Sequence, residues 1–238
     1  MTDVHDLEPL KRSAALKAVE GVRDGQVVGL GTGSTARYVV LALGERVRAG
    51  LRIQAVPTSR ETAVLATQAG IVLLADDAPW ALDLAIDGTD QVDPQMNLIK
   101  GGGGALLREK IVAAAARELI IVADHTKTVS VLGGPTPLPV EVIPFGWRAT
   151  ARHLEQTGGR AVLRERQGQV FVTDAGHYIV DLYLSKIEDP ASLEIRLNQI
   201  PGVVECGLFV GRTTTLILGT PQGVQVQTKA GSPRVAGR

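Results

Sequence analysis

The sequence predicts an α/β fold with a mostly parallel sheet and a smaller α+β module. Between residues 26 and 124, short apolar runs of strand length alternate with amphipathic segments of helix length. Continuous apolar strands separated by helices are typical of a parallel sheet that is covered on both faces. From about residue 131 the sequence pattern changes to loops rich in proline and glycine and to strands of alternating apolar and polar residues. This pattern indicates an inserted or appended α+β module.

The predicted elements of the parallel-sheet region follow one another along the chain. A helix is expected at about 10–24, and "QVVGLGT" predicts a buried strand that leads through a glycine turn into a helix at 34–50. The next elements are strand 52–56, helix 59–70, strands 71–74 and 82–87, a helix from the glycine run at 101–104 to about 117, and strand 118–124. The segment "TTTLILGT" predicts a last strand that returns to this sheet.

Composition and charge exclude several classes of protein. The 238 residues are 45% hydrophobic, enough to bury the core of one large domain or two smaller ones. Lysine plus arginine and aspartate plus glutamate number 25 each, so no global charge attracts nucleic acid or an anionic membrane. Because Cys206 is the only cysteine, an internal disulfide is excluded, and we expect a cytoplasmic protein without a signal peptide or a membrane span.

The segment "GLGTGSTA" (29–36) lies between a predicted strand and a predicted helix. Gly31, Gly33 and Ala36 match G-x-G-x-x-A, where free backbone N–H groups and the helix dipole favour an anion. A dinucleotide site also needs an acidic residue after the second strand, which here ends in "AVPTSR". The hydroxyls of Ser34 and Thr35 suit a phosphate monoester better, and a turn that only packs helix on strand is the alternative.

Three aspartates follow the strand at 82–87. Asp87 and Asp90 sit at its carboxyl end, where open α/β sheets bind ligands, and Asp93 comes shortly after. Their spacing lacks the pattern of a calcium loop, and no nearby histidine supports a transition metal, so a metal is not favoured. The alternative is a set of turn aspartates that bind their own backbone.

The run "IKGGGGALLREKI" (99–111) predicts a site in front of a helix. Lys100 and four glycines precede an apolar stripe that includes Leu106, Ile111 and Val112. Four glycines disfavour both helix and strand, and glycine is expected where backbone lies against a ligand. Glu109 follows in the helix, where a solvated charge is the usual fate of a glutamate.

The segment "ADHTK" (123–127) again places charged residues at the end of a predicted strand. Asp124 and Lys127 flank His125, which is either a catalytic acid or base or a bystander in a polar turn. Four polar clusters at four strand ends point to acid/base work on a small phosphorylated substrate.

These segments, together with "PLPVEVIP" (137–144) and in this order, closely resemble the type A ribose-5-phosphate isomerase family. The resemblance implies interconversion of ribose 5-phosphate and ribulose 5-phosphate through an enediolate, without metal or cofactor, in the non-oxidative pentose phosphate pathway. It implies that Glu109 is the general base and that Asp87 and Asp90 contact sugar hydroxyls and assist ring opening. Lys100 would lie at the reactive end of the sugar. The implied substrate-binding residues are Thr32, Gly33, Ser34, Thr35, Gly88, Thr89, Gly101, Gly102, Gly103, Lys127 and, with a weaker match, Lys11.

The resemblance also implies the domain organisation. A Rossmann-like domain is expected from 1–130 and 207–238, with a polar tail from about 226 that we expect to be disordered, and a small ferredoxin/ACT-like α+β domain from 131–206. A homodimer or homotetramer is implied, and the apolar "VVECGLFV" (203–210) suits a core or an interface equally. Gln91 and Thr89 depart from the glutamate and alanine usual in the family, which puts local hydrogen bonding in question.

Three rival functions remain at this stage. A related phosphosugar isomerase-deaminase would share the general fold. A non-catalytic sugar-phosphate sensor would keep the phosphate loop but would have no need for Glu109 together with Lys100, and no helix-turn-helix precedes the α/β region. A dehydrogenase is disfavoured by the missing acid after the second strand.

Overall fold

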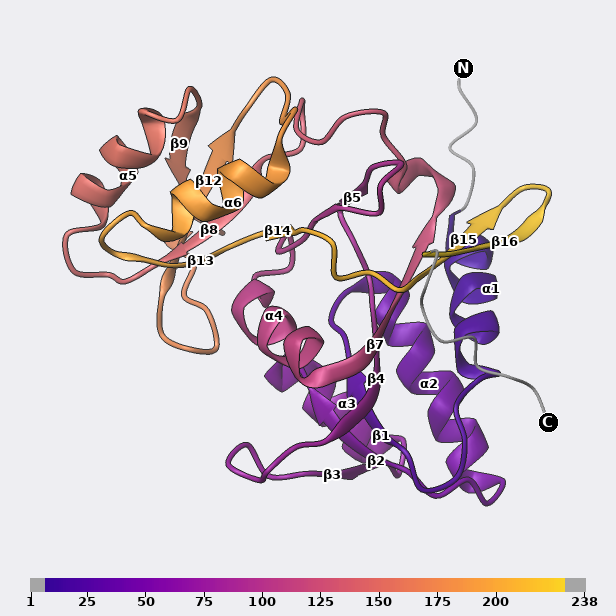
Figure 1. Ribbon diagram of the computed structural model, residues 1–238. Helices are drawn as coiled ribbons and strands as arrows, with labels where there is room; N and C mark the ends of the chain where they lie inside the picture. Colours follow the sequence, from indigo (N-terminus) through magenta and orange to yellow (C-terminus); the bar gives the residue numbers. More distant parts are fainter. Residues whose placement is uncertain (1–6, 230–238) are drawn as a thin grey trace. The chain divides into compact units, whose positions relative to one another are not determined.

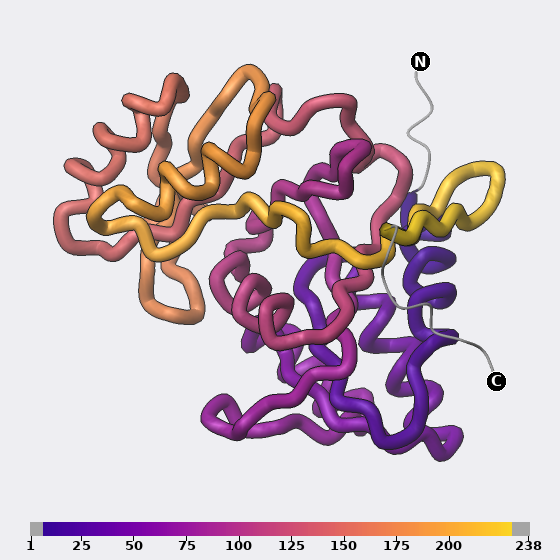
Figure 2. Tube along the Cα trace, in the orientation of Figure 1, coloured from indigo at the N-terminus to yellow at the C-terminus, as the bar shows by residue number. Residues whose placement is uncertain are grey.

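The computed structural model describes residues 7–229, which fold into two compact units (Figure 1). The first unit comprises 7–88, Val112–Thr126 and 213–229, and the second comprises Thr89–Ile111 and Lys127–Arg212. Neither unit is one continuous segment: the first contains residues from near both ends of the chain, which are indigo and yellow in Figure 2. Each unit buries its own cluster of apolar side chains, so each has its own core.

Seven strands form the sheet of the first unit, in the spatial order β16, β15, β7, β4, β1, β2, β3. All pairings are parallel except that of β15 with β16. This is a doubly wound order, and it confirms the predicted parallel sheet with a returning last strand. The strands are β1 (Val27–Leu30), β2 (Gln54–Pro57), β3 (Val72–Leu73), β4 (Leu82–Asp87), β7 (Ala116–Asp124), β15 (Thr215–Thr220) and β16 (Gly223–Thr228).

Helices cover both faces of this sheet. Three of them, α1 (Glu8–Val19), α2 (Ser34–Arg48) and α3 (Arg60–Gln68), share one buried cluster with alternate strand residues such as Val28 and Leu30. Because successive strand residues point to opposite faces, Gly29 faces the other way. A Cβ added there would lie 2.5 Å from Val112 Cγ1 of α4 (Leu106–Ala115), so α4 packs on the opposite face.

The second unit contains a four-stranded antiparallel sheet in the order β13, β8, β12, β9. Two amphipathic helices, α5 (Trp147–Glu155) and α6 (Pro190–Asn198), bury Leu154, Leu193 and Leu197 in the cluster that the sheet's apolar residues form. This confirms the predicted α+β module. The strands are β8 (Leu138–Val142), β9 (Arg160–Leu163), β12 (Tyr178–Tyr183) and β13 (Val203–Cys206), with a separate hairpin of β10 (Glu165–Arg166) and β11 (Gln169–Val170).

The compact units differ from the predicted domain boundaries in the segment 89–111. The prediction places it in the Rossmann-like domain, whereas it groups with the second unit. The reason is strand pairing: β5 (Gln91–Val92) and β6 (Leu98–Ile99) pair with each other and with β14 (Leu208–Phe209) in a three-stranded sheet of their own. Of the tail expected from about 226, positions 226–228 belong to β16, and 230–238 lie outside the described residues.

The structure can be compared with three local predictions: the end of the first helix, the burial of Ile111 and the place of the apolar segment 203–210. The first helix ends at Val19 rather than at about 24. Ile111, which was expected in the buried stripe of its helix, is 49% exposed, whereas Leu106 and Val112 are buried. In the apolar segment 203–210, Cys206, Leu208 and Phe209 are fully buried within the chain, whereas residues 203–205 and 210 are half-buried. Within residues 7–229, no helix combines the length and apolar character needed to span a bilayer.

Candidate active site

Asp90 and Lys100 lie at the same end of the small sheet in the second unit. Asp90 directly precedes β5 and Lys100 directly follows β6, and the antiparallel register pairs Gln91 with Ile99. The Asp90 N–H donates to Ile99 O at 2.9 Å, and the Lys100 N–H donates to Gly207 O at 2.8 Å. Asp90 and Lys100, ten positions apart in the sequence, are therefore close together at the end of the sheet.

The glycine run after Lys100 forms a tight turn that small residues alone permit. Gly101 has φ +105° and Gly104 has φ +92°, values that side chains disfavour, and the Gly104 N–H donates to Gly101 O at 2.9 Å. The Gly102 N–H donates to Asp90 Oδ2 at 2.7 Å, and a Cβ on Gly102 would lie 2.8 Å from Asp90 Oδ1. The turn thus brings bare backbone against a carboxylate of the protein itself and gives two of the glycines the expected positive φ, whereas its contact with a ligand stays a prediction.

Glu109 and Lys100 form a buried ion pair. Glu109 is in the first turn of α4, and its Oε2 lies 3.3 Å from Lys100 Nζ, with the two side chains 5% and 3% exposed. The Lys100 ammonium also lies 5.4 Å from the centre of the Phe209 ring, at cation–π distance. The interpretation of Glu109 as a solvated helix charge is therefore wrong. A buried carboxylate beside a buried ammonium can move a proton while the ammonium stabilises developing negative charge.

The two departures from the family pattern have defined partners. Thr89 Oγ1 lies within hydrogen-bond distance of Gln91 O at 2.6 Å and of Ile99 O at 3.0 Å, which ties the loop to both strands. The Gln91 amide donates to Gly133 O and accepts from the Gly133 N–H, both at 2.8 Å. An ionised glutamate could not donate the first of these bonds. Gln91 is thus a structural link to the loop at 133.

The first unit holds the other predicted aspartate of this motif. Asp87 ends β4 and is 3% exposed. Its Oδ1 accepts hydrogen bonds from the Gly88 N–H at 2.7 Å and the Thr32 N–H at 3.2 Å. A Cβ on Gly31 would lie 2.1 Å from that same oxygen, so glycine is required for the β1–α2 turn to approach the carboxylate.

A cluster of hydroxyl groups holds this turn, and the sequence analysis did not identify it. Thr32 Oγ1 lies 2.7, 2.9 and 3.1 Å from the hydroxyls of Thr58, Ser59 and Thr62. Thr62 Oγ1 in turn donates to Gly31 O at 3.0 Å, and Ser59 caps α3 by accepting from the Thr62 N–H. The signal in the sequence is the hydroxyl-rich "PTSRET" at the end of the second strand, a segment that is notable for its hydroxyl groups as well as for its lack of a carboxylate before the glutamate.

The start of α2 presents a backbone suited to an anion. Gly33 is the residue before the helix, with φ +111° and no side-chain capping bond, and Gly33 and Ser34 are exposed. Thr35 is 8% exposed in the first turn. The N–H groups of a first helical turn carry partial positive charge, which favours a phosphate.

The two predicted substrate lysines differ in their surroundings. In the first unit, Lys11 on α1 pairs with Glu8 at 2.6 Å, and Glu8 also accepts from the Tyr38 hydroxyl. In the second unit, Lys127 ends a short 3₁₀ turn, is half-buried and forms no ion pair with any residue of 7–229. Asp124 is fully buried, and its Oδ1 accepts from the Thr126 N–H at 3.0 Å.

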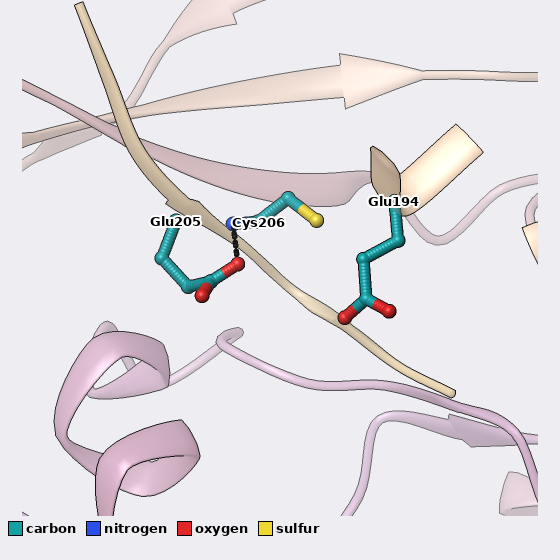
Figure 3. A group of neighbouring side chains, drawn as sticks. All are labelled: Glu194, Glu205 and Cys206. Atoms are coloured by element: carbon teal, nitrogen blue, oxygen red, sulfur yellow. Dashed lines mark hydrogen bonds between the residues drawn. The ribbon is translucent and has the colours of Figure 1, made fainter. Parts of the chain in front are cut away.

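The residues that could bind a metal ion, Asp93 and the cluster around Cys206, already have partners within the protein. Asp93 accepts hydrogen bonds from the N–H groups of Gln95 and Asn97. It therefore fits the alternative interpretation, an aspartate that binds the backbone of its own turn. Glu194, Glu205 and Cys206 gather in the second unit (Figure 3). The Lys110 ammonium lies 2.8 and 2.9 Å from these two glutamates, and burial raises the pKa of the Cys206 thiol to about 11. An ammonium is therefore the cation of this cluster.

Comparison with known proteins identifies the family. The profile of ribose 5-phosphate isomerase A (phosphoriboisomerase A) matches residues 54–223. A ribose-5-phosphate isomerase A from Gloeobacter violaceus is 54% identical over 229 residues, which cover 96% of this chain and all of that relative. The chain belongs to the ribose 5-phosphate isomerase A family. The resemblance drawn from the motifs is thereby confirmed.

Solved structures of ribose 5-phosphate isomerases share the fold. The enzyme from Methanocaldococcus jannaschii superposes with a TM-score of 0.90 at 41% identity, covering 94% of this chain and all of that one. A D-ribose-5-phosphate isomerase in complex with phospho-erythronic acid also gives 0.90, at 40% identity, covering 93% of this chain and 99% of the other. These matches confirm the predicted fold class.

Proposed function

We propose that this chain interconverts ribose 5-phosphate and ribulose 5-phosphate, a step of the non-oxidative pentose phosphate pathway. The observation that carries the proposal is the buried pair of Glu109 and Lys100, whose carboxylate and ammonium lie 3.3 Å apart. Membership of the ribose 5-phosphate isomerase A family supplies the substrate class. No step of an aldose–ketose isomerisation requires a redox cofactor, because one carbon is oxidised as its neighbour is reduced.

Glu109 is assigned the proton transfer between carbons. It removes the proton from C2 of the open-chain aldose, which leaves an enediolate, and then returns a proton to C1. Lys100 and backbone N–H groups of the glycine run stabilise the negative oxygen of this intermediate. The hydroxyl proton that must move between O2 and O1 is assigned to Asp90 or Asp87, which also assist opening of the sugar ring.

The phosphate is assigned to the β1–α2 turn and to Lys127. The first turn of α2 offers backbone N–H groups with the hydroxyls of Ser34 and Thr35 beside them. Thr32 is assigned to holding that turn, since its hydroxyl bonds to three other hydroxyls. Lys11 is assigned a lesser role because Glu8 already pairs with it.

The ligand of one related enzyme supports an enediolate mechanism. Phospho-erythronic acid, present in that solved structure, joins a carboxylate to a phosphorylated sugar-acid chain. A carboxylate is planar and anionic, as an enediolate is, and a site complementary to such an intermediate binds its analogues well. We extend the same binding to this chain, and we propose a cytoplasmic homodimer or homotetramer.

A sugar-phosphate sensor is the second candidate, and the buried ion pair argues against it. Burying Glu109 and Lys100 together costs desolvation of both charges. A binding site that only reads the phosphate would gain nothing from that cost. The same argument does not separate an isomerase from an isomerase-deaminase, so the assay must do so.

The test is turnover of ribose 5-phosphate after treatment with EDTA. We expect the parent chain to form ribulose 5-phosphate with no loss on metal removal. Glu109→Gln is expected to bind substrate and lose at least about a thousandfold in kcat, since the base is removed and the shape kept. Glu165→Gln, an exposed glutamate on β10, is the matched control. Loss of activity with EDTA, or full activity of Glu109→Gln, would contradict the proposal, and ammonia release from an amino-sugar phosphate would favour the deaminase.

A further inference from the structure

Arg164 holds the glycine run from its carbonyl side. Its Nη1 donates hydrogen bonds to Gly101 O at 2.7 Å and to Gly102 O at 3.2 Å. Both carbonyl groups therefore point to one guanidinium. Because these peptide bonds are trans, the N–H of each peptide unit points away from its carbonyl. The N–H groups of Gly102 and Gly103 thus face away from Arg164.

The opposite side of the run meets Asp90. The Gly102 N–H donates to Asp90 Oδ2 at 2.7 Å. The peptide unit between Gly101 and Gly102 is therefore bonded to Arg164 through its carbonyl group and to Asp90 through its N–H group. The next N–H, that of Gly103, has no acceptor among residues 7–229, and Gly103 is exposed. One amide of the run therefore orients a carboxylate, and the following amide is available to a ligand.

The sheet of the second unit fixes the guanidinium itself. Arg164 Nε donates to Asp181 Oδ2 at 2.8 Å, and Nη2 donates to Asp181 Oδ1, which makes a two-pronged pair. The two side chains are 10% and 13% exposed. Asp181 lies within β12, and the Arg164 N–H donates to Ile179 O at 2.8 Å. Planar paired bonds of this kind set orientation as well as distance.

We propose that Arg164, anchored by Asp181, is a positioning residue for the isomerisation. The inference rests on the proposed function, since it concerns the same reaction. Arg164 keeps the carbonyl dipoles of Gly101 and Gly102 turned away from the enediolate oxygen and presents the Gly103 N–H to it. Through the Gly102 N–H it also sets the direction of the Asp90 carboxylate. Arg166 Nη2 also donates to Gly103 O at 3.2 Å, but it does not reach the two carbonyl groups that Arg164 holds. Glycine backbone has wide freedom, so without Arg164 these two peptide units would adopt other conformations.

The variant that tests this is Arg164→Lys. Lysine keeps a positive charge for Asp181, but one ammonium cannot reproduce the planar fork that reaches Asp181 and two carbonyl groups together. Arg160→Lys is the matched control, because Arg160 lies on β9 of the same unit and stacks on Tyr183 at 4.6 Å, with no bond to the glycine run. Both proteins are compared with the parent in kcat, in KM for ribose 5-phosphate and in affinity for phospho-erythronic acid.

If Arg164 positions the glycine run, its substitution should lower kcat much more than it changes KM. We expect Arg164→Lys to lower kcat about ten- to a hundredfold, with KM changed less than about threefold. The affinity for phospho-erythronic acid should fall in parallel with kcat/KM, because the analogue reports binding of the intermediate. Arg160→Lys should match the parent in all three. A purely structural role would instead lower the amount of active protein and leave the constants of the remaining fraction unchanged, and that result would overturn the inference.

Amide hydrogen exchange separates this inference from the proposed function. In Arg164→Lys the peptide that covers 99–106 should exchange faster than in the parent, since the Gly102 N–H loses its fixed geometry. Arg160→Lys should show no change. An inactive parent would overturn the proposed function, and unchanged exchange in Arg164→Lys would overturn the positioning role. If Arg164→Lys does not fold, Asp181→Asn takes its place, with the same losses expected at smaller size.

Discussion

The ammonium of Lys100 lies 3.3 Å from the carboxylate of Glu109, and both side chains are almost fully buried. The two residues are nine positions apart, one after a β-strand and the other in the first turn of α4. The glycine turn between them makes this approach possible, because its backbone reverses within four residues. The carboxylate and the ammonium to which we assign proton transfer and charge stabilisation thus lie in one short segment of the chain.

The closeness of this pair predicts strong coupling between its members. Lys100→Met is expected to lower kcat at least about a hundredfold, because the charge that stabilises the enediolate is lost. Since we assign both residues to one step, the double variant Lys100→Met with Glu109→Gln should be little slower than the slower single variant. Steady-state kinetics of the three variants checks this. Losses that multiply would show that the two residues act independently.

Lys127 is expected to act on substrate binding rather than on chemistry. It is half-buried and forms no ion pair with any described residue, as a lysine reserved for an anionic ligand would. Lys127→Ala should raise KM for ribose 5-phosphate about five- to fiftyfold and change kcat little. Lys186→Ala removes an exposed lysine that pairs with Glu188 and should leave KM unchanged. An unaltered KM in Lys127→Ala would remove this residue from the phosphate site.

Lys110 is predicted to support the fold and not the reaction. Its buried ammonium bridges Glu194 and Glu205 and lies 5.0 Å from the centre of the Phe209 ring. Lys110→Met should lower the free energy of unfolding by about 2–4 kcal/mol, because two partly buried glutamates lose their shared cation. Lys17→Met, which breaks an exposed pair with Glu20, should cost less than about 1 kcal/mol. Urea unfolding of both variants measures the difference, and equal losses would contradict this role.

The candidate site residues could be selected from the sequence because they stand in local motifs. Strand ends marked by glycine and aspartate, such as "DGTD" and the run after Lys100, carry their signal within a few residues. The alternation of apolar strands and helices likewise predicted the parallel sheet, since its period depends on burial alone. Glu109 itself gave no signal, and its importance came from its neighbours.

The supporting residues could not be predicted, because their partners are distant in sequence. Arg164 reaches Gly101 across 63 positions, and Gln91 reaches Gly133 across 42. Nothing in the sequence "LRERQG" distinguishes Arg164 from the exposed Arg166 two residues later. The grouping of 89–111 with the second unit also has no local signal, since the pairing of β6 with β14 is a contact across more than a hundred residues.

The single cysteine is predicted to be unreactive in the folded protein. Burial raises the pKa of the Cys206 thiol to about 11, so the thiolate is a very small fraction at about pH 8. Iodoacetamide should label the native protein slowly and the urea-unfolded protein completely, and mass spectrometry distinguishes the two. Rapid labelling of the native protein would mean that the segment around β13 opens readily.

Glu141 predicts a pH dependence of stability. It is 1% exposed on β8, and it accepts hydrogen bonds from Thr173 Oγ1 at 2.8 Å and bonds to His177 Nδ1 at 3.0 Å. Burial is the largest influence and raises the pKa of this carboxyl above its usual 4.5, against the opposing effect of its hydrogen bonds. In the pH range that begins near 4.5 and extends upward to the raised value, the folded state therefore holds more protons than the unfolded state at this residue. Its contribution to stability is present below that range and is lost as pH rises through it.

Glu141→Gln should remove this dependence, because glutamine does not titrate. Measured by urea unfolding at a series of pH values, the stability of the parent relative to Glu141→Gln should fall as pH rises from about 4.5 and then level off. The constant offset between the two proteins also contains the changed hydrogen bonds with Thr173 and His177, so the slope is the diagnostic quantity. Glu165→Gln, an exposed substitution, should run parallel to the parent. A slope of opposite sign would mean that the hydrogen bonds outweigh burial at Glu141 and that the carboxylate, not the acid, is the form the fold favours.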